Sequence, residues 1–169
     1  MHIAELWRYP IASVSGEMLA DARIGKTGLS GDRRFSVACR TSGEVAAPEH
    51  SARWQRLPLV SARGSGLNLW LRTPDTDWLP AFGVAAQDAL DAHCGFPVTL
   101  QATGLWRGQA PSPGRIQPRY PRAPLHVVSR RALARFAQAV PHQDMSARRF
   151  RANLVLDGDE DEEQEALRP

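Results

Sequence analysis

Short stretches in which apolar and polar residues alternate recur along the first hundred residues. Residues 3–14 alternate until Pro10 interrupts the pattern, which predicts a strand that ends in an extended segment. Turn residues separate the stretches at intervals of about 8 to 12 residues, which favours a barrel or sandwich of short strands. The other expected strands of this part lie at 18–24, 34–39, 59–63 and 67–72, the last two joined by Gly64-Ser65-Gly66.

The pattern changes from residue 84 onward. Residues 85–93 are strong helix formers and stop at Gly95, so they predict a helix with a glycine at its end. Ser129 stands where it can cap a second helix over 130–140, whose apolar residues recur at helical spacing. The fold class expected is mainly β with a few helices (α+β). The remaining elements are strands at 96–100, 125–128 and 153–156 and an irregular Pro- and Gly-rich loop at 104–124.

Composition agrees with a folded domain. The chain has 169 residues, 43% of them hydrophobic and 23% charged, which allows a core and excludes wholesale disorder. No apolar run approaches the roughly 20 residues that a membrane-spanning helix needs. The N-terminal residues show neither the basic nor the apolar region of a secretion signal, so we expect a cytoplasmic protein that does not bind membranes.

Charge is divided unevenly along the chain. Residues 1–156 hold 20 Arg and Lys against 11 acids, a net charge of +9, whereas residues 157–169 hold seven acids against Arg168. The basic body favours an anionic ligand or nucleic acid as its partner. Cys39 and Cys94 are too few for a disulfide framework and match no metal-ligand spacing, so both are expected to be reduced and buried.

Familiar catalytic motifs are missing from the sequence. Gly25-Lys26-Thr27 lacks the first glycine of a phosphate-binding loop, the five histidines form no local pair, and no nucleophile elbow occurs. We therefore assign no catalytic residue and no metal ligand. Four short clusters at strand ends instead offer Arg, Ser or Asn, side chains suited to a phosphate and to the edge of a heterocycle. They lie at 9–13, 31–35, 125–129 and 149–153.

The order and spacing of these clusters resemble the MOSC family, the molybdenum-cofactor sulfurase C-terminal domain proteins, including their N-terminal β-barrel region. The resemblance covers about residues 3–160 and implies a β-barrel-like N-terminal domain that binds molybdopterin. Family positions that grip the pterin cofactor correspond here to Ser13, Arg33, Ser129, Arg151 and Asn153. Guanidinium groups suit a phosphate dianion, and hydroxyl and amide groups suit the pterin edge.

Three departures from the family limit what the resemblance implies. The family's lysine is Ala12 and its proline is Ala152. Family members continue past the strand at 153–156 into a segment with the cysteine that ligates molybdenum, and neither Cys39 nor Cys94 lies in such a context. We therefore expect that this chain alone does not catalyse the redox reaction. The expected organisation is an N-terminal barrel region at 1–122, an incomplete MOSC domain at 123–158 and an acidic tail at 159–169.

The resemblance implies a molybdopterin-binding protein that is part of an oxidoreductase or a sulfur carrier. Its implied partners are the pterin cofactor and a redox partner protein, with nucleic acid not expected. A second copy of the chain is a further expected partner, because an unfinished second domain exposes apolar surface through which it can dimerise. The first alternative is an interaction or regulatory domain without catalysis. The second is a module for single-stranded nucleic acid that uses the arginines and aromatic residues of the Pro- and Gly-rich loop: Arg107, Arg115, Arg119, Arg122, Trp106 and Tyr120.

Overall fold

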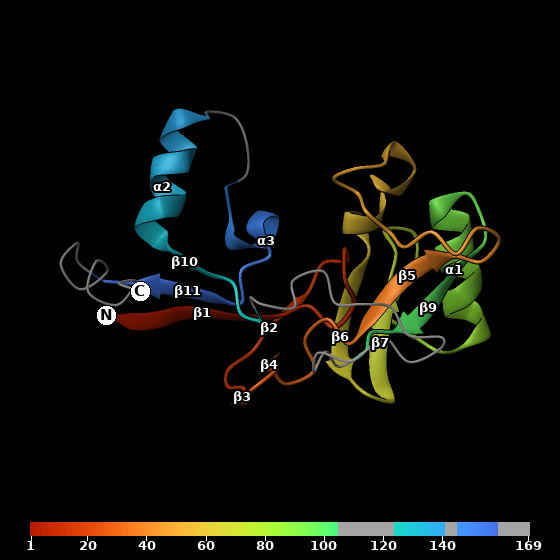
Figure 1. Cartoon of the computed structure of the whole chain (residues 1–169), viewed down its shortest axis with the longest axis horizontal. Coiled ribbons are helices and arrows are strands. Elements are labelled where there is room, and N and C mark those ends of the chain that lie inside the picture. The colour runs from red at the N-terminus through yellow and green to blue at the C-terminus, as the bar shows by residue number, and fades with distance from the viewer. Residues whose placement is uncertain (105–123, 141–144, 159–169) are drawn as a thin grey trace.

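The computed structural model describes residues 1–104, 124–140 and 145–158. Short strands dominate this part of the chain, with helices inserted between them (Figure 1). The strands are β1 (His2–Arg8), β2 (Glu17–Met18), β3 (Ile24–Gly25), β4 (Gly28–Leu29), β5 (Phe35–Cys39), β6 (Ser61–Ser65), β7 (Asn68–Arg72), β8 (Leu79–Pro80), β9 (Val98–Ala102), β10 (Val127–Ser129) and β11 (Leu154–Asp157). The helices are α1 (Val84–Cys94), α2 (Arg130–Ala139) and α3 (Ala147–Phe150), with short 3-10 helices η1 (Ala52–Trp54) and η2 (Leu57–Leu59).

One sheet joins the two ends of the chain. Its strand order is β10-β11-β1-β2, in which β10 and β11 are parallel and the other neighbours are antiparallel. Val155 of β11 is fully buried against α3, and Trp7, Val128 and Leu133 pack around it. A small core therefore forms between this sheet and the helices α2 and α3.

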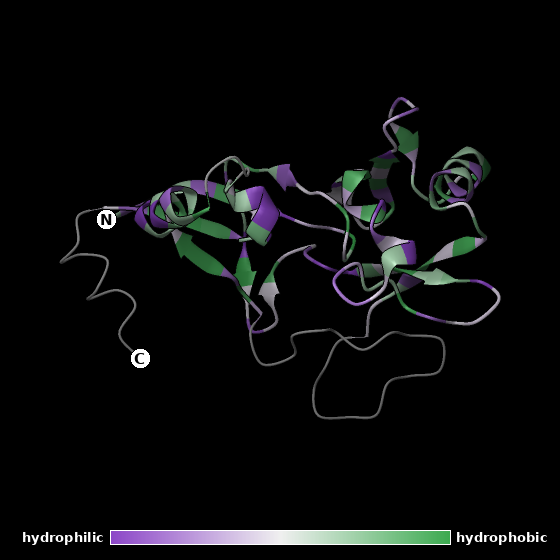
Figure 2. Ribbon diagram, turned by 90° about the horizontal axis from the view of Figure 1, so that it is seen from above, coloured by the Kyte–Doolittle hydropathy of each residue, from purple (hydrophilic) through white to green (hydrophobic). Residues whose placement is uncertain are grey.

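A second, larger core lies in the other half of the molecule, as the two groups of apolar strands in Figure 2 illustrate. Strands β5 and β9 pair there, and β6-β7-β8 form a separate antiparallel sheet. Trp54 and Leu57 from η1 and η2 and Leu90 from α1 are buried between them. The segment 9–16 leads from the small core into this larger one and contributes Ile11 and Val14 to it.

The expected mainly β fold with a few helices is confirmed, but the described residues form no closed barrel. The segment 9–16 touches β5 through a single bridge, Ile11 to Phe35, and touches β6 through another, Ser15 to Ser61. Closure of a barrel needs a continuous ladder of strand pairs. Here the pairs belong to separate short sheets, so the β-rich region stays open.

Both helices that the sequence predicts are present. Gly95 follows α1 with a φ of 78°, the left-handed conformation expected of a glycine at a helix end, and the Ser129 hydroxyl accepts a hydrogen bond from the Ala132 N–H. The apolar face of α2 is only partly covered: Leu133 packs in the small core, whereas Phe136 is 52% exposed.

Several expected strand boundaries are wrong. The first strand ends at Arg8, shortly before the expected interruption at Pro10, but the stretch expected as one strand at 18–24 is divided between β2 and β3. Leu59 belongs to η2, because Pro58 lies in the first turn of that 3-10 helix, so β6 starts only at Ser61. Most of the expected loop at 104–124 and the whole acidic tail at 159–169 lie outside the described residues.

Two further sequence expectations concern membranes and cysteines. In the described ranges, no helix combines the length and apolar character needed to cross a bilayer. Cys39 and Cys94 are both free thiols, as expected. Cys39 is buried, whereas Cys94 is only half-buried.

Candidate functional site

Tyr9 lies where the chain leaves β1 and passes from the small core to the larger one. Its side chain is buried, and its ring stacks on Trp7 with 6.5 Å between the ring centroids. The Tyr9 N–H donates to the Asp32 Oδ1 atom over 2.7 Å, and the Tyr9 carbonyl accepts from the Arg33 N–H over 2.7 Å. These two bonds hold the turn at 31–34 against the start of the segment 9–16, at the junction between the cores.

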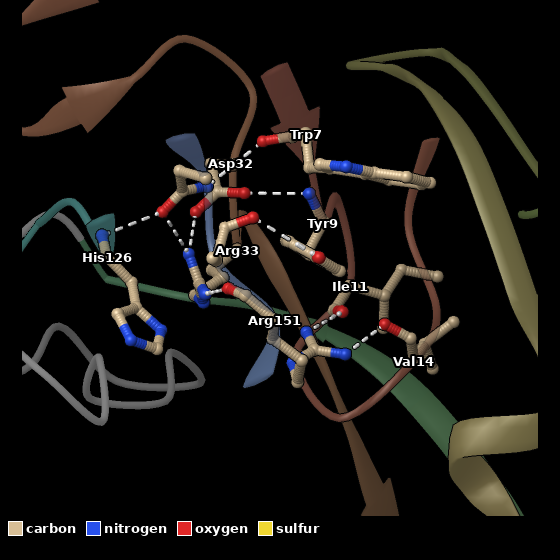
Figure 3. A network of polar contacts seen from close by, with 10 residues as sticks. Trp7, Tyr9, Ile11, Val14, Asp32, Arg33, His126 and Arg151 are labelled. Carbon is tan, nitrogen blue, oxygen red and sulfur yellow. Dashed lines mark hydrogen bonds and ion pairs between the residues drawn. The ribbon is translucent and has the colours of Figure 1, made fainter. Parts of the chain in front are cut away.

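Arg33 is held at this junction from several sides (Figure 3). Its guanidinium forms an ion pair with Asp32 and lies over the Tyr9 ring, 5.4 Å from the centroid. The Nη1 atom donates to Asn153 Oδ1 over 3.1 Å, and the Nη2 atom donates to the Arg151 carbonyl over 2.9 Å. One quarter of the Arg33 side chain, 25%, is exposed. Arg33 is therefore an oriented cation that solvent can still reach.

Asn153 is completely buried and supports Arg33 from the protein side. Its Oδ1 atom accepts both from Arg33 and from the backbone N–H of His126, the latter over 3.1 Å. Its Nδ2 atom donates to the Trp7 carbonyl over 3.2 Å. Three of the four hydrogen bonds that an asparagine amide can make are thus used inside the protein. Asn153 ties together β1, the start of β10 and the turn that carries Arg33.

Arg151 follows α3 and brings a second guanidinium to the same tyrosine. It lies over the Tyr9 ring, 4.5 Å from the centroid. Its Nη2 atom donates to the Ile11 carbonyl over 3.3 Å and its Nη1 atom donates to the Val14 carbonyl. Because both carbonyls belong to the turn at 11–14, Arg151 fixes the shape of that turn. We call Tyr9, Asp32, Arg33, Arg151 and Asn153 the Tyr9 cluster.

The backbone is strained at three positions in and beside the Tyr9 cluster. Ser13, Arg33 and Arg151 have φ values of 64°, 47° and 53°, and no other non-glycine residue of the described part has a positive φ. The left-handed conformation costs such residues roughly 1–2 kcal/mol each. Strain of this kind persists where surrounding contacts enforce it, and it concentrates at functional sites. All three residues are among the five that the sequence predicted for cofactor binding.

The charges of the Tyr9 cluster leave a positive surplus. The five residues of the cluster include two guanidinium groups, both over the Tyr9 ring, and one carboxylate, that of Asp32, which pairs with Arg33. Burial raises the pKa of Tyr9 to about 12, even though the charges of Arg151 and Arg33 act in the opposite direction. The phenol therefore stays neutral near pH 7 and donates its proton to the Ala152 carbonyl over 3.3 Å. The surplus charge suits an anionic ligand at the exposed side of Arg33.

The five predicted cofactor residues fall into three groups in the structure. Arg33 contacts both Asn153 and Arg151. Ser13 is in the adjoining turn, 8% exposed, with its hydroxyl donating to the Ala46 carbonyl over 3.4 Å. Ser129 lies at the far end of β10 from this site, where its hydroxyl caps α2. The structure thus brings four of the five together and gives Ser129 a different role.

Tyr9 and Asp32 are site residues that sequence reasoning missed. Both residues lie within the clusters at 9–13 and 31–35. The sequence did not indicate that Tyr9 lies against Arg33 and Arg151, or that Asp32 accepts from the Tyr9 N–H. Only the fold shows that one ring lies under two guanidinium groups contributed by residues 118 positions apart. The nearest signal was the position of Asp32 directly before Arg33, with which it forms an ion pair in the structure.

The site fits an anionic cofactor such as a pterin phosphate in part. Arg33 is a cation with an exposed side, as phosphate recognition requires. The donors of Arg151 and Asn153, by contrast, already bind backbone carbonyls. The described residues contain no group of three or more His, Cys, Asp or Glu that suits a metal ion. Cys39 lies at the opposite end of β5 from Phe35, so its thiol is not part of this site.

Two family models match the chain. One, described as the MOSC N-terminal beta barrel domain, matches residues 1–92, and the other, described as the MOSC domain, matches residues 108–167. A comparison with curated proteins returned no match. Strand β1 lies in the first matched region and β11 in the second, and they pair directly. The Tyr9 cluster likewise combines Tyr9, Asp32 and Arg33 from the first region with Arg151 and Asn153 from the second.

Proposed function

Because the chain belongs to the MOSC family, we propose that it binds molybdopterin, the molybdenum cofactor, at the Tyr9 cluster. MOSC domains are generally associated with proteins that bind this cofactor. The observation that carries the proposal is the strained backbone at Ser13, Arg33 and Arg151, which coincides with three residues of the predicted binding set. A fold that maintains this strain at a junction with surplus positive charge is suited to hold a phosphorylated ligand.

Within the proposed site, Arg33 is the residue that contacts the cofactor phosphate. Its exposed side faces solvent while Asn153 and the Arg151 carbonyl orient the guanidinium from within. Arg151 and Asn153 are positioning residues: the first shapes the turn at 11–14 and the second holds Arg33. Ser13 lies in that turn, beside the proposed ligand position. Ser129 is not assigned a contact with the ligand; its hydroxyl stabilises the start of α2.

When bound, the cofactor supplies a molybdenum centre for two-electron chemistry. The residues of this chain bind and orient it, and we assign none of them a catalytic step. The chain then acts as the cofactor-binding part of an oxidoreductase or a sulfur carrier, together with a redox partner protein. Cytoplasmic residence and homodimer formation belong to the same proposal.

A second candidate is an interaction or regulatory domain that binds no cofactor. It is favoured by one specific observation: the polar groups of Asn153 and the terminal nitrogens of Arg151 are engaged by the protein itself. Under this reading the Tyr9 cluster serves only to join the two cores. Loss of Arg33 then lowers stability and changes no ligand affinity.

Calorimetric titration of the chain with molybdopterin, paired with thermal unfolding, separates the two candidates. We expect measurable heat and a raised Tm for the intact chain. Arg33→Lys keeps the charge but loses the guanidinium fork, so it should weaken binding at least about tenfold. Arg23→Ala, at an exposed arginine preceding β3, is the matched control and should bind normally. Absence of both heat and thermal shift in the intact chain contradicts the cofactor proposal.

A further inference from the structure

The outward face of the β6-β7-β8 sheet carries arginine and tryptophan side chains that the proposed function does not use. Leu69 and Leu71 of β7 point into the large core, so the alternate residues Trp70 and Arg72 point outward. Arg63 of β6 is directly opposite Trp70. We call Arg63, Trp70, Arg72 and Trp78 the Arg-Trp face.

Trp78 extends this face toward β8. In the β7–β8 pair, Trp70 faces Pro80 and Leu71 faces Leu79, so the next position places Trp78 opposite Arg72. The Arg72 guanidinium lies over the Trp78 ring, 5.1 Å from its centroid. The Arg63 guanidinium lies over the same ring at 4.3 Å. One indole therefore orients two cations on the outside of the sheet.

The cations of the Arg-Trp face have no anionic partner in the described part of the chain. No ion pair or hydrogen bond of the Arg63 or Arg72 side chain occurs there, and both residues are exposed. The other outward positions of β6 and β7 are serine and asparagine. Asp75 and Asp77 lie in the turn before Trp78 and form no ion pair with either arginine. A guanidinium stacked on an indole keeps its N–H edge available for a phosphate.

The aromatic surface is available as well. Trp70 is 38% exposed although it lies in the middle strand of the sheet. A ring exposed in this way is a platform on which a nucleobase can stack, and stacking tolerates any base. An acidic peptide can form ion pairs with the two arginines, but it offers no regular series of aromatic rings to stack on the indole of Trp70. Single-stranded nucleic acid carries both groups that this face can bind, because its phosphates alternate with bases that are free to stack.

We propose that the Arg-Trp face binds single-stranded nucleic acid, with phosphates at Arg63 and Arg72 and a base on Trp70. The net charge of +9 on residues 1–156 adds a long-range attraction for such a polyanion. The sequence alone led us not to expect nucleic acid as a partner, because the loop at 104–124 has only two aromatic residues and they are unevenly placed. The strand register now brings together residues from a different region.

Fluorescence anisotropy with a labelled oligomer of about 12 thymidines tests this proposal. We expect binding in about 50 mM salt that weakens as salt rises, because phosphate contacts release counterions. The double variant Arg63→Ala/Arg72→Ala removes two such contacts. It should lower the affinity at least about tenfold and reduce the slope of log affinity against log salt by about 1.4. Arg23→Ala, an exposed arginine elsewhere, should leave both unchanged.

Two substitutions of the tryptophan separate stacking from charge. Trp70→Ala should weaken oligonucleotide binding at least about fivefold, whereas Trp70→Phe retains a ring and most of the affinity. Far-ultraviolet circular dichroism verifies that each variant is folded. The proposal is overturned if the chain does not bind the oligomer in low salt. It is also overturned if none of these substitutions changes the affinity. Equal or tighter binding of polyglutamate overturns it too, since the face then recognises acidic peptides.

Discussion

Arg33 donates a 3.1 Å hydrogen bond to Asn153, a residue 120 positions later in the sequence. The bond joins the turn before β5 to the residue that directly precedes β11 and thereby links the two family-matched regions of the chain. Asn153 completes the link through His126 and Trp7. The residue proposed to contact the cofactor is thus oriented by the same side chain that holds the two halves of the molecule together.

Asn153→Ala should therefore destabilise the whole chain. It removes the partners of the His126 N–H and of the Trp7 carbonyl, and an unpaired buried polar group costs about 1–3 kcal/mol. We expect the free energy of unfolding to fall by about 2–4 kcal/mol in urea titrations. Asn68→Ala, at an exposed position of β7, is the control and should change it by less than about 0.5 kcal/mol. Equal effects of the two would refute a bridging role for Asn153.

Ser13 should show the cost of its strained backbone. Glycine adopts a φ of 64° without the steric penalty that a Cβ atom brings. Ser13→Gly should thus be more stable than Ser13→Ala by about 1 kcal/mol in thermal or urea unfolding. Both variants lose the same hydroxyl, so their difference isolates the backbone term. If Ser13→Ala and Ser13→Gly have the same unfolding free energy, the backbone at residue 13 is not strained.

Ser129 should affect stability but not ligand binding. Its hydroxyl caps α2, and loss of such a cap typically costs about 1 kcal/mol. Ser129→Ala should therefore lower the unfolding free energy by about that amount, whereas Ser129→Thr, which keeps a hydroxyl, should lose less. The affinity for molybdopterin should be unchanged in both. A large loss of molybdopterin affinity in Ser129→Ala would instead show that Ser129 takes part in cofactor binding.

The two thiols should ionise in different pH ranges. Hydrogen bonds from the Ser42 and Thr41 hydroxyls lower the pKa of Cys39 to about 6, whereas burial and the nearby Asp91 raise the pKa of Cys94 to about 11. Thiolate absorbance at 240 nm should thus rise near pH 6 in the intact chain and in Cys94→Ser, but not in Cys39→Ser. Because the folded-state pKa of Cys39 is the lower one, its contribution to stability should grow from about pH 6 to about pH 9. A single thiolate transition above pH 8 would contradict this assignment.

Gly16 should resist substitution for steric reasons. A Cβ atom there would overlap the Arg8 carbonyl oxygen and lie 2.7 Å from the Tyr9 ring. Gly16→Ala should accordingly lower the unfolding free energy by about 1–3 kcal/mol, as overpacking does. Gly25→Ala meets no atom within 4 Å and should be neutral or slightly stabilising in the same urea titration. The reverse order of the two variants would show that the segment at 16 can move aside.

Local signals in the sequence were sufficient for some elements. Gly95 caps the end of α1 and Ser129 caps the start of α2 as expected, because helix caps depend on a few neighbouring residues. The strands β5, β7 and β11 also lie close to their expected ranges. The boundaries of β2, β3 and β6 were wrong, since long-range pairing decides where a short strand stops.

The sequence by itself determined the mainly β fold class, the helix caps, the basic body and the motifs that indicated the family. Tertiary structure alone decided how those motifs combine. It placed Arg33 and Arg151 over one tyrosine ring and Ser129 at the start of α2, away from that ring. It also left the β-rich region open and aligned Arg63 with Trp70. Caps and alternation arise from interactions between near neighbours. Which distant side chains meet depends instead on strand order and register. These are fixed by the burial of apolar residues from the whole chain in the two cores, and not by near neighbours.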